Sequence, residues 1–217
     1  MEILAFVWDV VVHLDKHLAS LLQQYGTWIY VLLFLIVFCE TGLVVTPFLP
    51  GDSLLFVAGA LWAAAGMDAR LLAATLIVAA LCGDNVNYWV GRFFGPKVFR
   101  WEGSRFFNRA ALDKTHSYYE RFGGRTIIIA RFVPLVRTFA PFVAGVGTMP
   151  YPRFIAYSVA GALLWVISLV TAGYFFGNVP VVKDNLTLVI FAIIGLSVAP
   201  IAIELVRSRL RRASESL

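Results

Sequence analysis

Long apolar runs, interrupted by Pro, Gly and charged residues, dominate the chain. Three of them reach the length of a membrane-crossing helix and cover residues 69–95, 151–177 and 186–206. About 20 consecutive apolar residues span the hydrocarbon core of a bilayer. Because lipid offers no hydrogen-bond partner to an open backbone, each run is predicted to be helical. The pattern therefore predicts an all-α polytopic membrane protein with about three full transmembrane helices.

The first 26 residues have a different pattern. Apolar positions recur at helical spacing along one side, and they alternate with ionisable residues such as Asp9, Asp15 and Lys16. Several charges at bilayer depth would be unfavourable, whereas a helix lying in the interface keeps them in water. Residues 1–26 are predicted to form an interfacial helix.

Two further apolar stretches, residues 27–65 and 126–147, are interrupted by helix-breaking residues. The predicted breaks are Pro47, Pro50 and Gly51 in the first stretch and Pro134 and Pro141 in the second. Proline removes a backbone donor and disrupts a helix interior, and non-helical backbone is tolerated at membrane depth only inside protein. Both stretches are therefore predicted to be re-entrant hairpins, which enter and leave on the same side of the membrane.

Composition and charge place the whole chain in the bilayer. Residues 1–217 are 60% hydrophobic and 14% charged, and this composition predicts one integral membrane domain. Basic residues concentrate in a loop at 96–125 and in a tail at 207–217, which predicts that both are cytoplasmic. The loop fits contact with anionic lipid rather than with nucleic acid. The two cysteines lack metal-ligand spacing, so neither a metal nor a cofactor is expected.

The two halves of the chain repeat one plan. Residues 56–59 and 142–145 share the sequence Phe-Val-Ala-Gly, and residues 91–95 match 173–177 as two Gly-flanked aromatic segments. The long helix of the first half ends at the basic loop, whereas its counterpart begins on that side. The sequence therefore predicts an inverted repeat with opposed hairpins, as in many secondary transporters.

Four charges lie where the surroundings are apolar. The first hairpin carries Glu40 and Asp52, and the second carries Arg131 and Arg137. Each would cost about 2.5–3.5 kcal/mol at the bilayer centre, so opposite charges are expected to pair between the hairpin tips. The arginines are predicted to bind an anionic group, and the carboxylates to exchange protons as it enters or leaves. A purely structural clamp remains the alternative.

A polar patch inside the 69–95 span adds Asp84 and Asn87. These side chains line the same cavity or hydrogen-bond a neighbouring helix, and both interpretations stay open. A hydrolase-like Gly-Asp-Ser-Leu sequence at 51–54 and an Asp-Lys-Thr-His sequence at 113–116 are expected to lie on different levels of the membrane, so no enzyme activity is predicted.

Three segments carry a family resemblance: residues 38–59, the patch at 83–88, and residues 130–145. They resemble the bacterial DedA family, which is related to the VTT (SNARE-associated) lipid scramblases. The resemblance implies a polytopic inner-membrane protein with two opposed re-entrant hairpins. It also implies transport driven by the proton motive force, with undecaprenyl phosphate or phosphatidylethanolamine as family substrates. The family's functional residues fall on Glu40, Asp52, Arg131 and Arg137.

The leading prediction is a proton-coupled lipid flippase of the bacterial cytoplasmic membrane, with a cytoplasmic C-terminus. Its partners would be membrane lipids, an anionic lipid headgroup (most of all undecaprenyl phosphate) and protons, and no nucleic acid. A homo-oligomer is compatible with the sequence. The alternatives are a flippase or scramblase of phosphatidylethanolamine or another phospholipid, a small-oxyanion carrier, and a structural or assembly protein.

Overall fold

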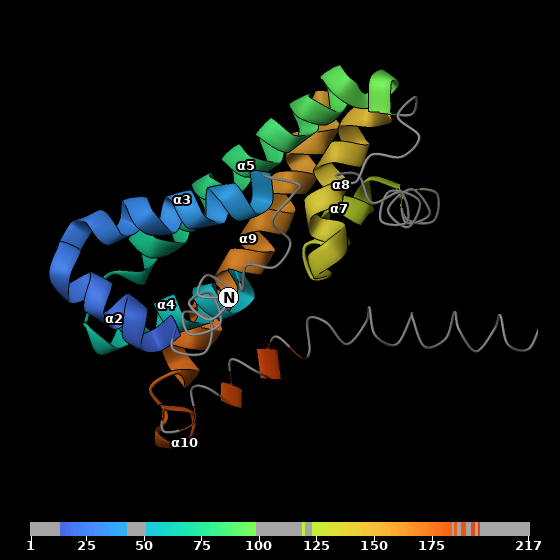
Figure 1. The fold of residues 1–217 in the computed structure, drawn as a ribbon. Helices are drawn as coiled ribbons and strands as arrows, with labels where there is room; N and C mark the ends of the chain where they lie inside the picture. The colour runs from blue at the N-terminus through green and yellow to red at the C-terminus, as the bar shows by residue number, and fades with distance from the viewer. Residues whose placement is uncertain are drawn as a thin grey trace, which may run out of the picture.

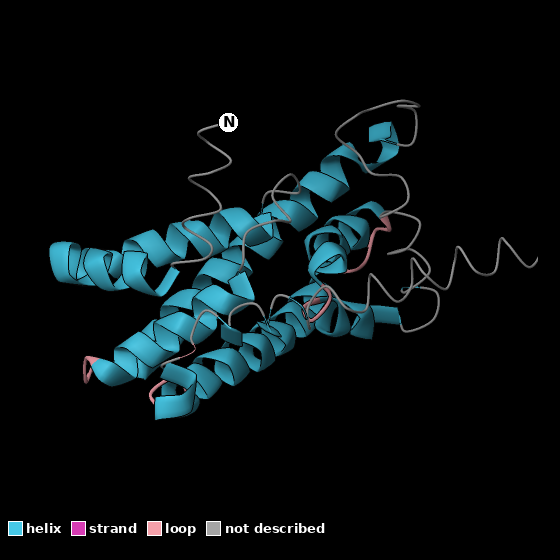
Figure 2. Cartoon of the chain, turned by 60° about the horizontal axis from the view of Figure 1, so that its bottom comes forward, coloured by secondary structure: helices cyan, strands magenta, loops and turns pink. Residues whose placement is uncertain are grey.

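The structure is a computed structural model that describes residues 14–42, 51–98, 119, 123–183, 185, 188–189, 192–193 and 195. The described residues form helices joined by short turns, without a strand among them (Figure 2). The elements, in chain order, are α2 (Leu14–Tyr25), the 3₁₀ turn η1 (Gly26–Trp28), α3 (Ile29–Gly42), α4 (Gly51–Ala64), α5 (Ala69–Val98), the 3₁₀ turn η2 (Gly123–Arg125), α7 (Thr126–Ala130), α8 (Pro134–Val146), α9 (Tyr151–Phe176) and α10 (Pro180–Lys183).

Two long helices, α5 and α9, form the frame of the molecule; they pack against each other and lie at an angle to one another (Figure 1). They contain 30 and 26 residues, which corresponds to about 45 Å and about 39 Å of helix. Both exceed the roughly 30 Å of a bilayer core. Among the described residues, three segments are long and apolar enough to cross a membrane: Lys16–Gly42, Ala69–Phe94 and Tyr151–Phe176. The prediction of an all-helical polytopic membrane protein is confirmed.

The first of these segments is bent. The sequence had been divided at residue 26 into an interfacial helix and a hairpin arm, whereas length and composition allow all of Lys16–Gly42 to cross a membrane. Gly26, with φ +53, lies between α2 and α3, and the chain turns back there so that α2 packs on α4 (Figure 1). The division predicted from sequence therefore coincides with a turn, because glycine reaches this left-handed backbone conformation without strain.

Short helices fill the space beside the frame. Helices α3 and α4 have 14 residues each and α8 has 13, so each is about 20 Å long and cannot span the bilayer as a straight helix. A turn at Arg131, Phe132 and Val133 separates α7 from α8. Val133 is extended there, with φ −121 and ψ 102, because the ring of Pro134 disfavours a helical conformation for the residue before it.

The predicted hairpin breaks have different outcomes. Pro134 begins α8 and Gly51 begins α4, so a helix starts at each of these two predicted breaks. Pro141 differs, because it lies inside α8, which continues through it to Val146. The close packing of α8 against α5 supports the helix across the proline, whose cost is local. Pro47 and Pro50 lie outside the described residues.

Segments matched by the sequence repeat make matched contacts. Helix α4 packs on α9, and α8 packs on α5. A Cβ atom added at Gly59 would collide with the Val170 carbonyl, and one added at Gly145 would collide with the Tyr88 carbonyl. In return, a Cβ at Gly173 would strike the Phe56 carbonyl, and one at Gly91 the Phe142 carbonyl. Each glycine therefore lets a short helix approach a long one at backbone distance, as small residues do in membrane proteins.

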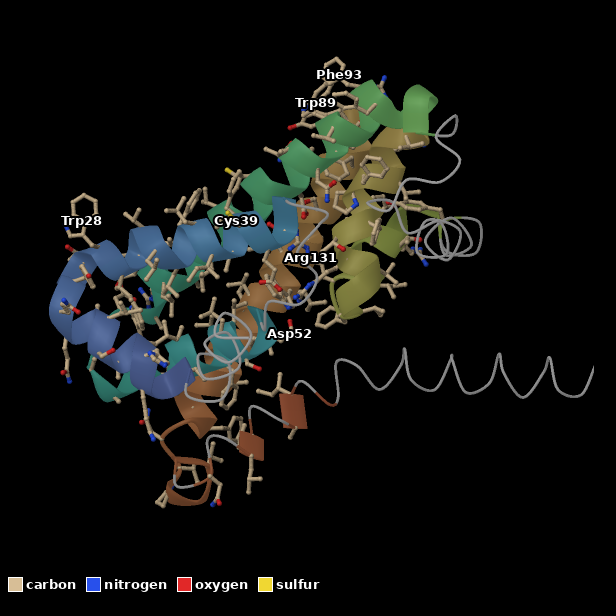
Figure 3. The ribbon with its side chains drawn as sticks, viewed as in Figure 1. Trp28, Cys39, Asp52, Trp89, Phe93 and Arg131 are labelled. Atoms are coloured by element: carbon tan, nitrogen blue, oxygen red, sulfur yellow. The ribbon has the colours of Figure 1, made fainter. Side chains whose placement is uncertain are left out.

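Aromatic side chains project outward at opposite ends of the molecule, and the buried charges lie between them. Trp28 is 70% exposed at one end, and Trp89 and Phe93 are 41% and 71% exposed at the other. Figure 3 shows Asp52 and Arg131 in the middle, between these two groups. Tryptophan and other aromatic rings favour the two membrane–water interfaces, so the charges are expected near mid-membrane.

Several predicted segments fall outside the described residues. They are the N-terminal residues 1–13, most of the predicted loop at 96–125, most of the predicted span at 186–206, and the tail at 207–217. Predictions about these segments remain predictions.

Candidate functional site

Arg137 connects three short helices by its charge. Its two terminal nitrogens bind two carboxylates: Nη2 pairs with Glu40 Oε1 from α3, and Nη1 lies 2.8 Å from Asp52 Oδ1 at the start of α4. Glu40 is completely buried and Arg137 is 8% exposed. The predicted pairing of acids in the first hairpin with a base in the second is therefore present at Arg137.

The local sequence explains how these groups converge. Glu40 lies two residues before the end of α3, and Asp52 lies in the first turn of α4, where the positive end of the helix dipole favours a carboxylate. Gly51 allows the approach, because a Cβ there would overlap the Glu40 carboxylate. Arg137 occupies the first turn of α8. All three charged residues therefore come from the ends of helices rather than from the middle of a helix face.

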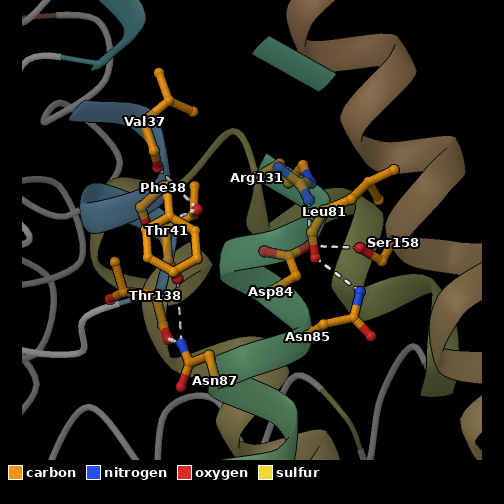
Figure 4. Close-up of polar contacts among 10 residues, drawn as sticks. All are labelled: Val37, Phe38, Thr41, Leu81, Asp84, Asn85, Asn87, Arg131, Thr138 and Ser158. Carbon is orange, nitrogen blue, oxygen red and sulfur yellow. Dashed lines mark hydrogen bonds and ion pairs between the residues drawn. The ribbon is translucent and has the colours of Figure 1, made fainter. Parts of the chain in front are cut away.

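Arg131 has a different partner from the one expected. Its guanidinium pairs with Asp84 of α5, which is 4% exposed, and the Ser158 hydroxyl of α9 donates to the same Asp84 oxygen at 2.5 Å (Figure 4). Arg131 lies in the turn before α8, so its side chain leaves the hairpin from a different point than Arg137. Gly161 makes room for it, because a Cβ there would lie 3.2 Å from Arg131 Cδ.

Trp165 of α9 joins the two ion pairs, and the sequence analysis did not identify it. Its ring centroid lies 5.8 Å from Arg131 Cζ and 5.4 Å from Arg137 Cζ, within the range of a cation–π contact. Its Nε1–H donates to Asp52 Oδ1 at 2.8 Å, and the residue is 1% exposed. The missed signal was a tryptophan in the middle of a span, since a buried indole needs a polar partner and interfacial positions are more common.

A small cavity lies between the two arginines. Its volume is about 10 Å³, which is room for about one water. A phosphate group would not fit without a rearrangement of the surrounding side chains. The cavity is lined by Thr41, Asp84, Ile127, Arg131, Arg137, Pro141 and Trp165.

Asp84 and Asn87, left open between two interpretations, occupy different environments. Asp84 lines the cavity and also hydrogen-bonds across helices. Asn87 Nδ2 donates to the carbonyl oxygens of Thr41 at 3.4 Å and Thr138 at 2.6 Å, so it ties α5 to α3 and α8 (Figure 4). Asn87 is not among the residues that line this cavity, and its observed contacts are those of a helix tie.

Hydrogen-bonding capacity remains at the site. Among the described residues, the buried Nε atoms of Arg131 and Arg137 have no hydrogen-bond partner. A buried donor without a partner is unfavourable by about 1–3 kcal/mol, so an acceptor that enters the site would be stabilised by bonding to it.

Tyr119 lies close to the site, and its hydroxyl donates to the Ala140 carbonyl at 3.0 Å. Burial, with a smaller contribution from the Asp84 charge, raises the pKa of the Tyr119 phenol, so it remains a donor.

Other candidate chemistry is sparse in the described part of the chain. No cluster of three or more His, Cys, Asp or Glu side chains there has an arrangement that could hold a metal ion. Neither Cys39 nor Cys82 forms a disulfide. Ser53, the serine of the hydrolase-like sequence, is completely buried in α4, and residues 113–116 lie outside the described residues.

Two long helices with short helices beside them, and four buried charges joined by the partly buried Asp52, define a polytopic membrane protein with an internal ionic site. The chain belongs to the VTT domain family, whose pattern matches residues 49–202. It is 56% identical to Protein DedA of Escherichia coli K12 over 96% of both chains. It is 43% identical to the uncharacterized membrane protein Rv0364 of Mycobacterium tuberculosis, over 80% of this chain and 77% of the relative.

A third relative, the inner membrane protein YqjA of E. coli K12, is 37% identical over 70% of both chains. No solved structure matches the chain. The predicted family is thus confirmed, and membership in a family of membrane proteins agrees with the helices found here.

Proposed function

We propose that this protein is a proton-coupled flippase that moves an anionic phospholipid across the bacterial cytoplasmic membrane, with undecaprenyl phosphate as its substrate. The proposal includes no enzymatic reaction. The observation that carries it is a single one: two buried arginines face one cavity, and each is held by carboxylates that an anion could replace.

The chemistry of the arginines supports an anionic headgroup. A guanidinium binds phosphate through parallel hydrogen bonds and keeps its charge at any physiological pH. The Nε donors of Arg131 and Arg137 lack partners among the described residues, so each side chain has a donor to offer. Together they would hold two edges of a phosphate in the cavity.

The arrangement of the helices supports alternating access. The proposal treats α3–α4 and α7–α8 as two opposed re-entrant hairpins of an inverted repeat, with the basic loop and C-terminal tail in the cytoplasm. Helix α4 packs on α9 as α8 packs on α5, so the two hairpins make equivalent contacts. Each hairpin could therefore take up the conformation of the other, which would open the site first to one side of the membrane and then to the other. Lipid tails would stay in the bilayer, so the protein would shelter only the headgroup.

Proton coupling follows from competition for Arg137. When an anion binds this guanidinium, Glu40 and Asp52 lose their cationic partner. A buried carboxylate without a partner is unfavourable when ionised, so it takes up a proton. Release of the anion on the other side reverses the exchange. The pair would therefore titrate as a coupled unit rather than as two independent groups.

The main rival is a structural clamp, and the small cavity favours it as a second candidate. The cavity has room for about one water, and each arginine is already paired with a carboxylate in this conformation. A clamp predicts that the ion pairs stabilise the fold and never part. A small-oxyanion carrier or a phosphatidylethanolamine scramblase would use the same arginines with a different cargo.

Reconstitution in liposomes separates these functions. Undecaprenyl phosphate, phosphatidylethanolamine and inorganic phosphate would be tested in turn for transbilayer movement, with and without a pH gradient. We expect gradient-dependent movement of the lipid phosphate, and its loss in Arg131→Ala. Arg70→Ala is the matched control, because Arg70 is an exposed arginine at the start of α5. Movement of no cargo by well-folded protein would favour the clamp.

A further inference from the structure

Asp84 lies outside both hairpins and yet holds one of the two arginines. We propose that Asp84 is a second proton-exchanging counter-ion of the site, dedicated to Arg131, so that the two arginines are released by separate carboxylates. This inference rests on the proposed function and extends it to a residue on the α5 frame helix.

The geometry separates the two ion pairs. Arg131 pairs with Asp84, while Arg137 pairs with Glu40 and Asp52. The Trp165 ring lies within 6 Å of both guanidinium carbons and contributes no charge. Neither arginine shares a carboxylate with the other among the described residues. An anion that binds both arginines must therefore displace Asp84 from one and Glu40 and Asp52 from the other.

Ser158 allows Asp84 and Arg131 to separate. Its hydroxyl now donates to Asp84 Oδ2 at 2.5 Å. A hydroxyl can also accept a hydrogen bond, so Ser158 can accept one from the protonated acid. Asp84 therefore keeps a buried partner in both protonation states. When Arg131 turns toward an anion, Asp84 can take up a proton without losing its contact with α9.

Every packed element contributes to the environment of Asp84. The charged or titratable groups around it are Arg131 from the turn before α8, Arg137 from α8 with its partner Glu40 from α3, and Tyr119. Helix α9 contributes the uncharged Ser158 and Trp165. Arg131 is the nearest cation, so its movement toward an anion changes the field at Asp84 more than any other local event.

Asp84→Asn isolates this role, because the amide resembles the protonated acid in shape and can donate to Ser158. Binding of a short-chain phosphatidic acid and of inorganic phosphate to the purified full chain would be measured by calorimetry in buffers of different ionisation heat, which gives protons exchanged per ligand. The two probes separate a lipid phosphate from a free one. Melting temperature is recorded for each variant.

For the wild type we expect proton uptake on phosphatidic acid binding, and weaker binding in alkaline solution, where Asp84 competes for Arg131. Asp84→Asn should take up about one proton fewer per ligand and bind about tenfold tighter in alkaline solution. Ser158→Ala should lose part of the same uptake. Asp68→Asn, which changes an exposed acid whose side chain accepts a hydrogen bond from Arg70 N at 2.8 Å, is the control.

The outcomes are distinct. If Asp84→Asn retains full proton uptake, the Asp84 inference fails while the proposed function stands. If it binds more weakly in acidic and alkaline solution alike and melts lower, Asp84 is a structural partner only, and the inference fails. If the wild type binds neither probe, the proposed function and this inference fail together.

Discussion

Replacing Arg137 with glutamine tests stability and function at the same position. Arg137 is the cationic partner of Glu40, which is completely buried, and it shares Asp52 with the Trp165 indole. Arg137→Gln removes the charge and leaves a buried carboxylate uncompensated. We expect a large loss of stability together with a loss of lipid transport.

The magnitude follows from which partners remain. Breaking a buried ion pair on one side costs about 3–5 kcal/mol, equivalent to roughly 6–20 °C in melting temperature for a chain of this size. Arg131→Gln should cost less, because its partner Asp84 keeps the Ser158 hydrogen bond, whereas Glu40 loses the only side-chain partner recorded for it in the described part of the chain.

A double variant separates the two effects. Glu40→Gln added to Arg137→Gln replaces the ion pair with two neutral amides, which should recover most of the lost stability. Transport should stay abolished, because the guanidinium that would bind the anion is still missing. Thermal melting of detergent-solubilised protein and lipid movement in liposomes would be measured on the wild type, Arg137→Gln, Glu40→Gln and the double variant.

Two results would refute this reasoning. A melting temperature for Arg137→Gln equal to that of the wild type would mean that the buried pair contributes nothing. Normal transport by the stable double variant would mean that Arg137 is not an anion ligand, and the site would then be a clamp.

Three further predictions can be checked independently. Trp165→Phe keeps an aromatic ring against both guanidiniums but removes the indole donor, so lipid movement in liposomes should fall about five- to tenfold, and Trp165→Leu should lower it further. Gly59→Ala and Gly145→Ala should each lower the melting temperature by about the same amount, since both place a methyl group against a backbone carbonyl of the facing helix; unequal effects would contradict the matched packing. Single cysteines at 96–125 and 207–217, in a background without the native cysteines, should react with a membrane-impermeant thiol reagent from the same, cytoplasmic, side; labelling from opposite sides would mean that the second hairpin spans the membrane.

Much of the fold follows from local sequence. Long apolar runs predicted the helices at 69–95 and 151–177, and the structure places α5 at Ala69–Val98 and α9 at Tyr151–Phe176. Pro134 and Gly51 were predicted as hairpin breaks, and the structure begins α8 and α4 at these residues. These features depend on a few neighbouring residues, because apolar length and backbone conformation are properties of short segments.

The charge pattern also predicted one of the two ion pairs. Buried charges in an apolar sequence require partners, and opposite signs on two hairpins led to the contact of Arg137 with Glu40 and Asp52. The prediction succeeded at Arg137 because Glu40, Asp52 and Arg137 all lie near helix ends that meet.

Tertiary packing alone decided the rest of the site. The choice of Asp84 and Ser158 for Arg131, the position of Trp165 beside both guanidiniums, and the small volume of the cavity all depend on how α5 and α9 pack. Pro141 remained inside α8 for the same reason, since close packing on α5 outweighed a local preference. Sequence patterns establish that a buried charge needs a partner, whereas the distances between side chains 47 or 97 positions apart are fixed only when the helices pack.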